Sequence, residues 1–221
     1  MIKNREQIEK VGGWMEPRAM DFFEALNNIQ RAQGIEGHIM EIGTYYGKSA
    51  AVLGQFLAPH EEFYCNDTFS GYKKVENNFR NSFEAFFENM TGRKAIVRQM
   101  LSTELTPEIL DNKQFRIWHI DGYHSFEDTL ADMKLGASML AERGMIICDD
   151  FLNPDWLGVG QAINEFLRTE DYCLVAQGYN KTVIVRKADY EMYYNAIKAC
   201  GMENSPHNFL PYFGFLYLSM K

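Results

Sequence analysis

An α/β protein with a largely parallel sheet is the fold class that this sequence predicts. Seven short apolar runs, rich in β-branched and aromatic residues, recur along the chain, and segments with helical spacing separate the first five. Each run is almost continuously hydrophobic, which is typical of strands that are covered by helices on both faces. Five parallel strands followed by an antiparallel pair are therefore expected.

The seven predicted strands can be read directly from these runs. They are His38–Ile42, Phe63–Asn66, Ala95–Gln99, Phe115–Ile120, Gly144–Cys148, Tyr172–Ala176 and Thr182–Val185. Only the turn-rich segment 177–181 separates the last two runs, so these are expected to form a hairpin.

Helices are predicted between the strands from the spacing of apolar residues. One face of a helix is formed by Phe79, Phe83, Phe86, Phe87 and Met90. Ser125 followed by Asp128 forms a capping box. The helix that it opens is expected to carry Phe126, Leu130, Met133 and Leu140. A third helix, over 159–167, precedes the final pair of strands.

A single domain, residues 1–221, is expected from the length of the chain. Residues 1–37 form a helical extension in which Pro17 starts a helix, residues 38–187 form the core, and residues 188–221 form a helix with an aromatic tail. Segment 71–74 is a candidate lid. The tail, 209–217, is expected to pack in the core or in a dimer interface, and a homo-oligomer is therefore predicted.

The charge balance argues against two classes of partner. Thirty acidic and 22 basic residues give a formal net charge of −8, the opposite of what nucleic acids or anionic membranes attract. The four cysteines form no C-x-x-C pair, and the N-terminal residues lack the apolar core of a signal peptide. A cytoplasmic protein that binds neither nucleic acid nor membrane is expected.

The first predicted strand leads into a glycine-containing segment, 41–49. We compared this segment with three patterns of ligand-binding loops. A dinucleotide fingerprint fails because Tyr45 stands where the second glycine is required. A Walker A loop is one residue too short between Gly43 and Gly47, although a P-loop NTPase remains an alternative. The third pattern is an acidic residue, Glu41, with glycines two and six positions later, which suits a ligand other than a polyphosphate.

Polar residues also follow the later strands, where ligands of parallel sheets bind. Asp67 is placed to accept hydrogen bonds from ribose hydroxyls, and Ser102 could meet an adenine edge. Asp121, Asp149 and Asp150 would converge on one rim. Three carboxylates so close repel one another, and a hard divalent cation such as Mg²⁺ would relieve the repulsion.

Taken in order, these motifs resemble those of class I S-adenosylmethionine-dependent methyltransferases. The segments 119–128, 144–151, 66–71 and 11–15 are similar to motifs of the macrocin O-methyltransferase and cephalosporin-hydroxylase-like families. The resemblance implies a Rossmann-like, doubly wound, seven-stranded and mostly parallel sheet whose last strand is antiparallel.

The resemblance also implies roles for individual residues. S-adenosylmethionine would be bound by Glu41, Gly43, Thr44, Tyr45, Gly47, Ser49, Asp67, Thr68, Ser102, Asp121 and His124. Asp121, Asp149 and Asp150 would match a magnesium triad, and Asp121 or His124 would accept the proton of the substrate. His119, inside an apolar run, is interpreted as a core residue with satisfied hydrogen bonds.

The expected function is Mg²⁺-dependent O-methylation of a small metabolite such as a sugar, a polyketide or another natural product. A metal-free methyltransferase with His124 as base, a P-loop NTPase and a non-catalytic cofactor-binding module are the alternatives. The residues do not identify the hydroxylated acceptor.

Overall fold

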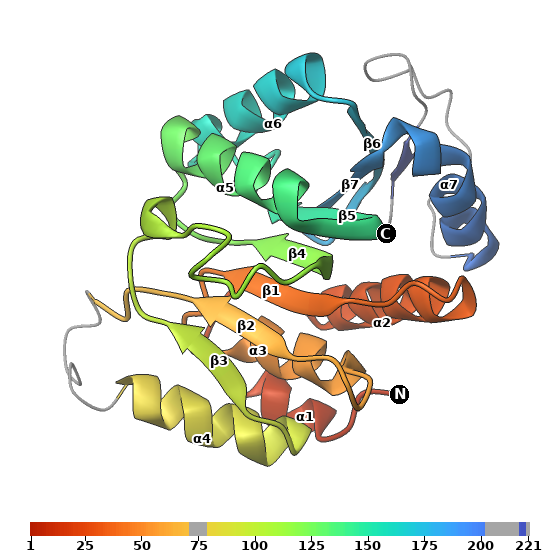
Figure 1. Ribbon diagram of the computed structural model, residues 1–221. Helices are drawn as coiled ribbons and strands as arrows, with labels where there is room; N and C mark the ends of the chain where they lie inside the picture. Colours follow the sequence, from red (N-terminus) through yellow and green to blue (C-terminus); the bar gives the residue numbers. More distant parts are fainter. Residues whose placement is uncertain (71–78, 202–216, 220–221) are drawn as a thin grey trace.

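The computed structural model describes residues 1–70, 79–201 and 217–219, and these form a mixed sheet between two layers of helices (Figure 1). The strand order is β3-β2-β1-β4-β5-β7-β6-β8. The strands are β1 His38–Ile42, β2 Phe63–Asn66, β3 Ala95–Arg98, β4 Phe115–Ile120, β5 Leu140–Asp149, β6 Tyr172–Gly178, β7 Lys181–Arg186 and β8 Leu218–Ser219.

The predicted fold class is confirmed, with β7 as the antiparallel strand. Strands β1 to β5 pair in parallel, and β7 runs antiparallel to both β5 and β6. The two-residue strand β8 adds to the edge of the sheet beside β6. The aromatic pattern of the tail did not predict it.

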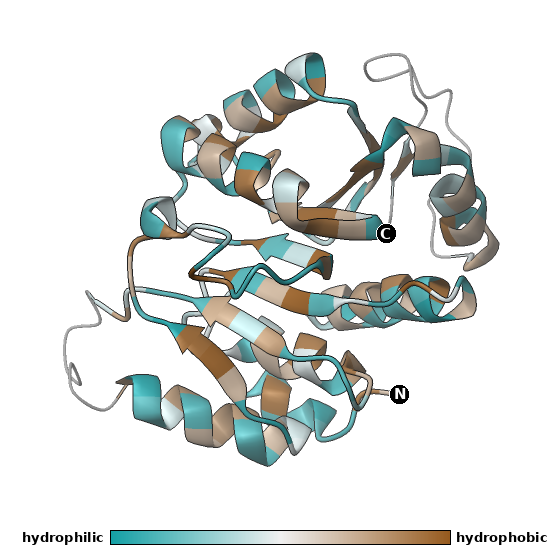
Figure 2. Ribbon diagram, viewed as in Figure 1, coloured by the Kyte–Doolittle hydropathy of each residue, from teal (hydrophilic) through white to brown (hydrophobic). Residues whose placement is uncertain are grey.

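Two apolar cores lie on the two faces of the sheet because successive strand residues point in opposite directions. Ile117 on β4 faces a core completed by α2, α3, α4 and α7, whereas Trp118 faces a core completed by α5 and α6. Hydrophobic residues accordingly colour most of the strands in Figure 2. The α-helices are α1 Arg5–Glu9, α2 Pro17–Ala32, α3 Lys48–Leu53, α4 Phe79–Thr91, α5 Phe126–Met139, α6 Leu157–Thr169 and α7 Tyr190–Ala199.

The local signals for helix starts are confirmed, but one helix assignment was wrong. Pro17 is the first residue of α2, and the Ser125 hydroxyl accepts a hydrogen bond from the Asp128 N–H at 3.1 Å. Leu140, expected on the same helix, instead begins β5 in an extended conformation. Its apolar side chain suits either element, and pairing with Phe115 of β4 places it in the sheet.

Several expectations about the flanks stay predictions. The candidate lid at 71–74 lies outside the described residues, and of the tail 209–217 only Tyr217 is described, packed against the core under α5 and α6. The homo-oligomer is not tested. Within residues 1–70, 79–201 and 217–219, no helix has the length and apolarity needed to cross a membrane.

A buried ion pair between Arg116 and Glu61 stabilises the packing of helix α2 against the sheet. The Arg116 side chain on β4 donates from Nε to Glu61 Oε1 at 3.0 Å and from Nη1 to Gln30 Oε1 of α2 at 2.8 Å. Arg31 of α2 also donates to Glu61. Burial raises the pKa of Glu61, but the two guanidinium groups outweigh it and hold this pKa at about 2.

Glu61→Gln is expected to lower the free energy of unfolding by about 3 kcal/mol at pH 7, because it leaves Arg116 buried without its counter-charge. The contribution of Glu61 is complete above its ordinary pKa of 4.5 and is lost as the pH falls toward about 2. Urea unfolding should therefore show the gap between variant and wild type closing from pH 5 to pH 2.

The matched control is Glu62→Gln, because Glu62 is a half-exposed neighbour whose ion pair with Lys113 lies near the surface. A loss of the same size in both variants would contradict the assignment.

Candidate active site

The loops that follow β1, β2, β4 and β5 meet at one edge of the sheet, marked in Figure 1 by the arrowheads of β2, β3 and β4. Every residue predicted for the site lies at a strand end or in the turn or helix start that follows it. These residues are Glu41, Gly43, Thr44, Tyr45, Gly47, Ser49, Asp67, Thr68, Ser102, Asp121, His124, Asp149 and Asp150.

Gly43 allows two loops to touch at this edge. It has a φ of 84°, and a Cβ at this position would lie 1.8 Å from the carbonyl oxygen of Asp121. The Asp121 N–H in turn donates to the Ile42 carbonyl at 2.8 Å. Any side chain at position 43 would therefore push the β4 loop away from the β1 loop.

Asp67 is held against the same loop by two backbone donors. Its Oδ2 accepts a hydrogen bond from the Tyr45 N–H at 2.8 Å, and its Oδ1 accepts one from the Phe69 N–H at 2.7 Å. Tyr45 and Phe69 both have positive φ values, of 46° and 51°. The carboxylate is thus fixed at the junction of the β1 and β2 loops by strained backbone on both sides.

Two buried polar atoms beside this junction have no hydrogen-bond partner among the described residues. They are Glu41 Oε2 and Thr44 Oγ1, whose side chains are almost completely buried. Burial raises the pKa of Glu41, and hydrogen bonds from His119 and Ser49 oppose that rise. A buried acceptor without a partner calls for an explanation, and contact with a bound ligand is one such explanation.

A row of four buried charged side chains crosses the sheet just inside this edge. Glu41 stands opposite His119 in the pairing of β1 with β4, and Asp149 stands opposite Lys181 in the pairing of β5 with β7. His119 Nδ1 is 3.0 Å from Glu41 Oε1, and Nε2 is 3.1 Å from Asp149 Oδ1. Lys181 Nζ donates to the other oxygen, Asp149 Oδ2.

Within this row, the two acidic side chains stabilise the charges of the two basic side chains. Burial disfavours the imidazolium of His119, but the charges of Asp149 and Glu41 outweigh it and raise the pKa to about 9. Burial likewise opposes the charge of Lys181, and Asp149 raises its pKa overall. Two bases and two acids therefore pair inside the protein, and His119 has the satisfied hydrogen bonds expected of it.

A second group, at the rim, consists of Asp121, His124 and Asp150. His124 Nε2 lies 3.1 Å from Asp150 Oδ2 and 3.6 Å from Asp121 Oδ1. Each residue offers one ligand atom, and these atoms all lie within 4.8 Å of one another. Burial lowers the pKa of His124, but the two carboxylates outweigh it and raise this pKa to about 9.

The backbone conformation of Asp150 and two neighbouring amides orient its carboxylate toward His124. Its φ is 62°, in the left-handed region, and the amides of Asn153 and Asn180 donate to Oδ1 at 2.8 Å and 2.9 Å. Burial raises the pKa of Asp150, but these amides and His124 hold it at about 2. The carboxylate is thus ionised and keeps Oδ2 directed toward His124.

The structure brings only two of the three predicted metal ligands together. Asp121 and Asp150 share the rim group with His124, whereas both oxygens of Asp149 face His119 and Lys181. Asp149 as a metal ligand stays a prediction. Sequence reasoning missed Lys181 because it placed this residue in the hairpin turn, whereas the residue begins β7.

Sequence reasoning also missed Asp132 on α5. The residue is buried, and a Cβ on Gly122 of the β4 loop would lie 3.6 Å from its Oδ2. Burial raises the pKa of Asp132 to about 7, and the hydroxyl of Ser102 opposes that rise. Asp132 therefore lies under the β3 and β4 loops, beside the serine predicted for the site.

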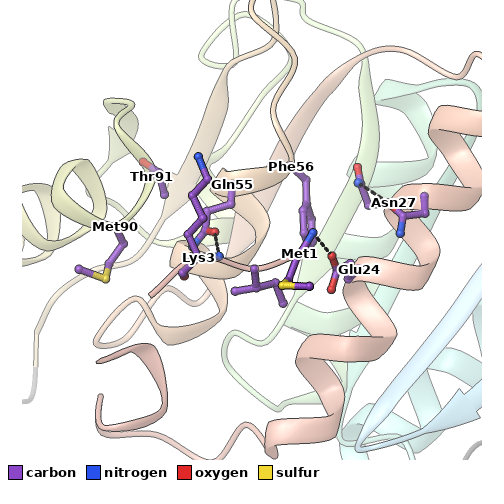
Figure 3. A pocket seen from close by; sticks show the side chains of 10 residues that line it. Met1, Lys3, Glu24, Asn27, Gln55, Phe56, Met90 and Thr91 are labelled. Atoms are coloured by element: carbon purple, nitrogen blue, oxygen red, sulfur yellow. Dashed lines mark hydrogen bonds and ion pairs between the residues drawn. The ribbon is translucent and has the colours of Figure 1, made fainter. Parts of the chain in front are cut away.

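A separate pocket of about 240 Å³ is shown in Figure 3 and contains none of the predicted site residues. It is lined by Met1, Ile2, Lys3, Glu24, Asn27, Asn28, Gln55, Phe56, Met90 and Thr91. The dashed lines in Figure 3 mark contacts such as the Lys3 N–H with Gln55 Oε1, at 2.7 Å. The carboxyl edge, not this pocket, is therefore the candidate active site.

Comparisons with known proteins identify the family of the chain. A family model described as a methyltransferase domain matches residues 40–151, from within β1 to just past the end of β5. No curated protein matches the chain.

Solved structures of methyltransferases share the fold. CalS11, a TDP-rhamnose 3′-O-methyltransferase, is 17% identical, with a TM-score of 0.60 over 79% of this chain and 82% of its own. The O-methyltransferase NovP is 12% identical, with a TM-score of 0.62 over 77% and 80%. An O-methyltransferase from Bacillus cereus in complex with SAH is 15% identical, with a TM-score of 0.60 over 83% and 90%.

Lys181→Met is expected to lower the free energy of unfolding by 3 kcal/mol or more, on the order of the cost of leaving one partner of a buried pair unpaired. The cause would be an unpaired Asp149 carboxylate, and chemical denaturation measures the loss.

The double variant Asp149→Asn, Lys181→Met removes both charges and should recover most of that stability. If the double variant were as unstable as the single variant, the row would not be held by the Asp149–Lys181 pair.

Proposed function

The chain belongs to the methyltransferase-domain family, and from this premise we propose that it transfers the methyl group of S-adenosylmethionine to a hydroxyl oxygen of a small molecule. One observation carries the proposal. The rim group Asp121, His124 and Asp150 lies directly beside the loop that runs from Gly43 to Gly47. A proton-accepting group and a candidate cofactor loop thus meet at one edge.

The cofactor half of the site is supported by the donors and acceptors around Asp67. The carboxylate is fixed by the N–H groups of Tyr45 and Phe69, which leaves lone pairs for two ribose hydroxyls. The unpaired acceptors at Glu41 and Thr44 suit the cationic methionine end of the cofactor. The Bacillus cereus neighbour was solved with SAH, the product of the same cofactor.

Methyl transfer to oxygen is an in-line displacement. The oxygen attacks the methyl carbon, the carbon–sulfur bond breaks, and S-adenosylhomocysteine leaves. A hydroxyl is a weak nucleophile until its proton departs, so a base close to the acceptor speeds the step. His124 in its neutral form is the proposed acceptor of that proton, and Asp121 and Asp150, which raise its pKa to about 9, stabilise the imidazolium that results.

A divalent cation, proposed to be Mg²⁺, fits the donor set of the rim. Mg²⁺ binds through one or two carboxylates and keeps several waters, so Asp121 and Asp150 suffice to hold it. When bound, the ion would lower the pKa of an acceptor hydroxyl. Asp149 is assigned instead to the buried row, where Lys181 and His119 already engage its carboxylate.

The P-loop NTPase is not supported, because the family model includes the β1 loop on which that alternative rested. A non-catalytic module would bind S-adenosylmethionine without making a methylated product, so a product screen by mass spectrometry separates it from the enzyme.

Isothermal titration calorimetry with S-adenosylmethionine tests the cofactor site. The wild type is expected to bind one equivalent, and Asp67→Asn to bind at least about tenfold more weakly, because charge-assisted hydrogen bonds to the ribose are lost. Asp171→Asn is the matched control, since Asp171 is exposed and pairs only loosely with Lys187. No binding by the wild type would refute the proposed function.

The cation site is tested with Mn²⁺ as a paramagnetic probe for Mg²⁺. Electron paramagnetic resonance should detect bound Mn²⁺ in the wild type and at least a tenfold loss of affinity in Asp150→Asn, while calorimetry shows unchanged S-adenosylmethionine binding. EDTA should abolish turnover. Full activity in EDTA would leave His124 as a metal-free base and contradict the cation site.

A further inference from the structure

Large apolar side chains are exposed on the two loops that carry the rim group. Tyr123, after β4, is 77% exposed, and Leu152 and Leu157, after β5, are each 70% exposed. Trp156 on the second loop is 45% exposed. Scattered exposed apolar residues are ordinary, but four of them within the two segments that carry one polar group indicate a binding surface.

Trp156 is the exposed apolar residue that contacts the rim group directly. Its ring stacks on the His124 imidazole with centroids 4.5 Å apart and an interplanar angle of 22°. Gly158 allows the start of α6 to approach the β4 loop closely, because a Cβ there would lie 2.7 Å from Phe126 N and 2.8 Å from His124 O. The indole is therefore fixed beside the proposed base and still has nearly half of its surface exposed.

The charges on these loops select against an anionic acceptor. Segments 121–127 and 149–157 contain no lysine or arginine, and their charged residues are Asp121, Glu127, Asp149, Asp150 and Asp155. A phosphate or diphosphate is normally bound by arginine or lysine. A negatively charged acceptor would find no lysine or arginine on either loop, and the one cationic side chain there, His124, is already paired with Asp121 and Asp150.

We propose that the methyl acceptor is an uncharged hydroxylated aromatic ring that stacks on Trp156 with its hydroxyl directed at His124. Stacking on a flat side chain orients a ring strongly and suits an aryl acceptor. The hydroxyl proton goes to His124, the oxygen–methyl bond forms as the sulfonium–methyl bond breaks, and S-adenosylhomocysteine is released. This inference rests on the proposed function and adds the acceptor class to it.

The test uses the full chain with S-adenosylmethionine and Mg²⁺, with catechol as the neutral aryl probe and TDP-rhamnose as the anionic sugar probe. Catechol should be methylated and TDP-rhamnose should not. Trp156→Ala should raise KM for catechol about tenfold, with the Kd for S-adenosylmethionine unchanged, and Trp156→Phe should stay within about threefold of the wild type. Tyr194→Ala, which removes a ring from α7, should change neither constant.

Leu152→Ser gives a second measurement at a site that is too exposed to matter for folding, and it should raise KM for catechol about threefold. Methylation of TDP-rhamnose in place of catechol would overturn the inference, as would an unchanged KM in Trp156→Ala. If S-adenosylmethionine binds and catechol is not methylated, the acceptor class is wrong while the cofactor site stands. If S-adenosylmethionine does not bind, the proposed function fails as well.

Discussion

The buried row of Glu41, His119, Asp149 and Lys181 is the constraint on which the site depends. It links four neighbouring strands, β1, β4, β5 and β7, at one level near their ends. Because buried charges are costly unless they are paired, any slip in the register of one strand would leave an ion without its partner. The loops of the site therefore start from fixed positions.

The same row reduces the repulsion between carboxylates from which the sequence predicted a metal. Three carboxylates at one rim would repel one another, but Lys181 and His119 neutralise Asp149 from inside the sheet. The rim then carries Asp121 and Asp150, with His124 between them. Two carboxylates and one imidazole are thus left at the rim for the proposed base and the proposed cation.

The positions of the strands along the chain, and the polar residues that follow them at one edge of the sheet, can be read from local patterns in the sequence. Continuous apolar runs mark strands that are buried on both faces, and Ser125 marks a helix start by its own hydrogen bond. Asp67, Asp121 and Asp150 could be predicted at this edge because each follows such a run.

The partner of Asp149 could not be predicted from the sequence, because Lys181 lies 32 residues away and meets it only through the antiparallel pairing of β7 with β5. The strain at Asp150 and the stacking of Trp156 on His124 likewise exist only in three dimensions.

A crystal structure of the protein grown with S-adenosylhomocysteine tests the central claim most directly. Electron density for the ligand is expected over the Gly43–Gly47 loop, with both ribose hydroxyls on the Asp67 carboxylate. Density in the pocket of Figure 3, or an empty carboxyl edge at saturating ligand, would contradict the assignment of this edge as the site of methyl transfer.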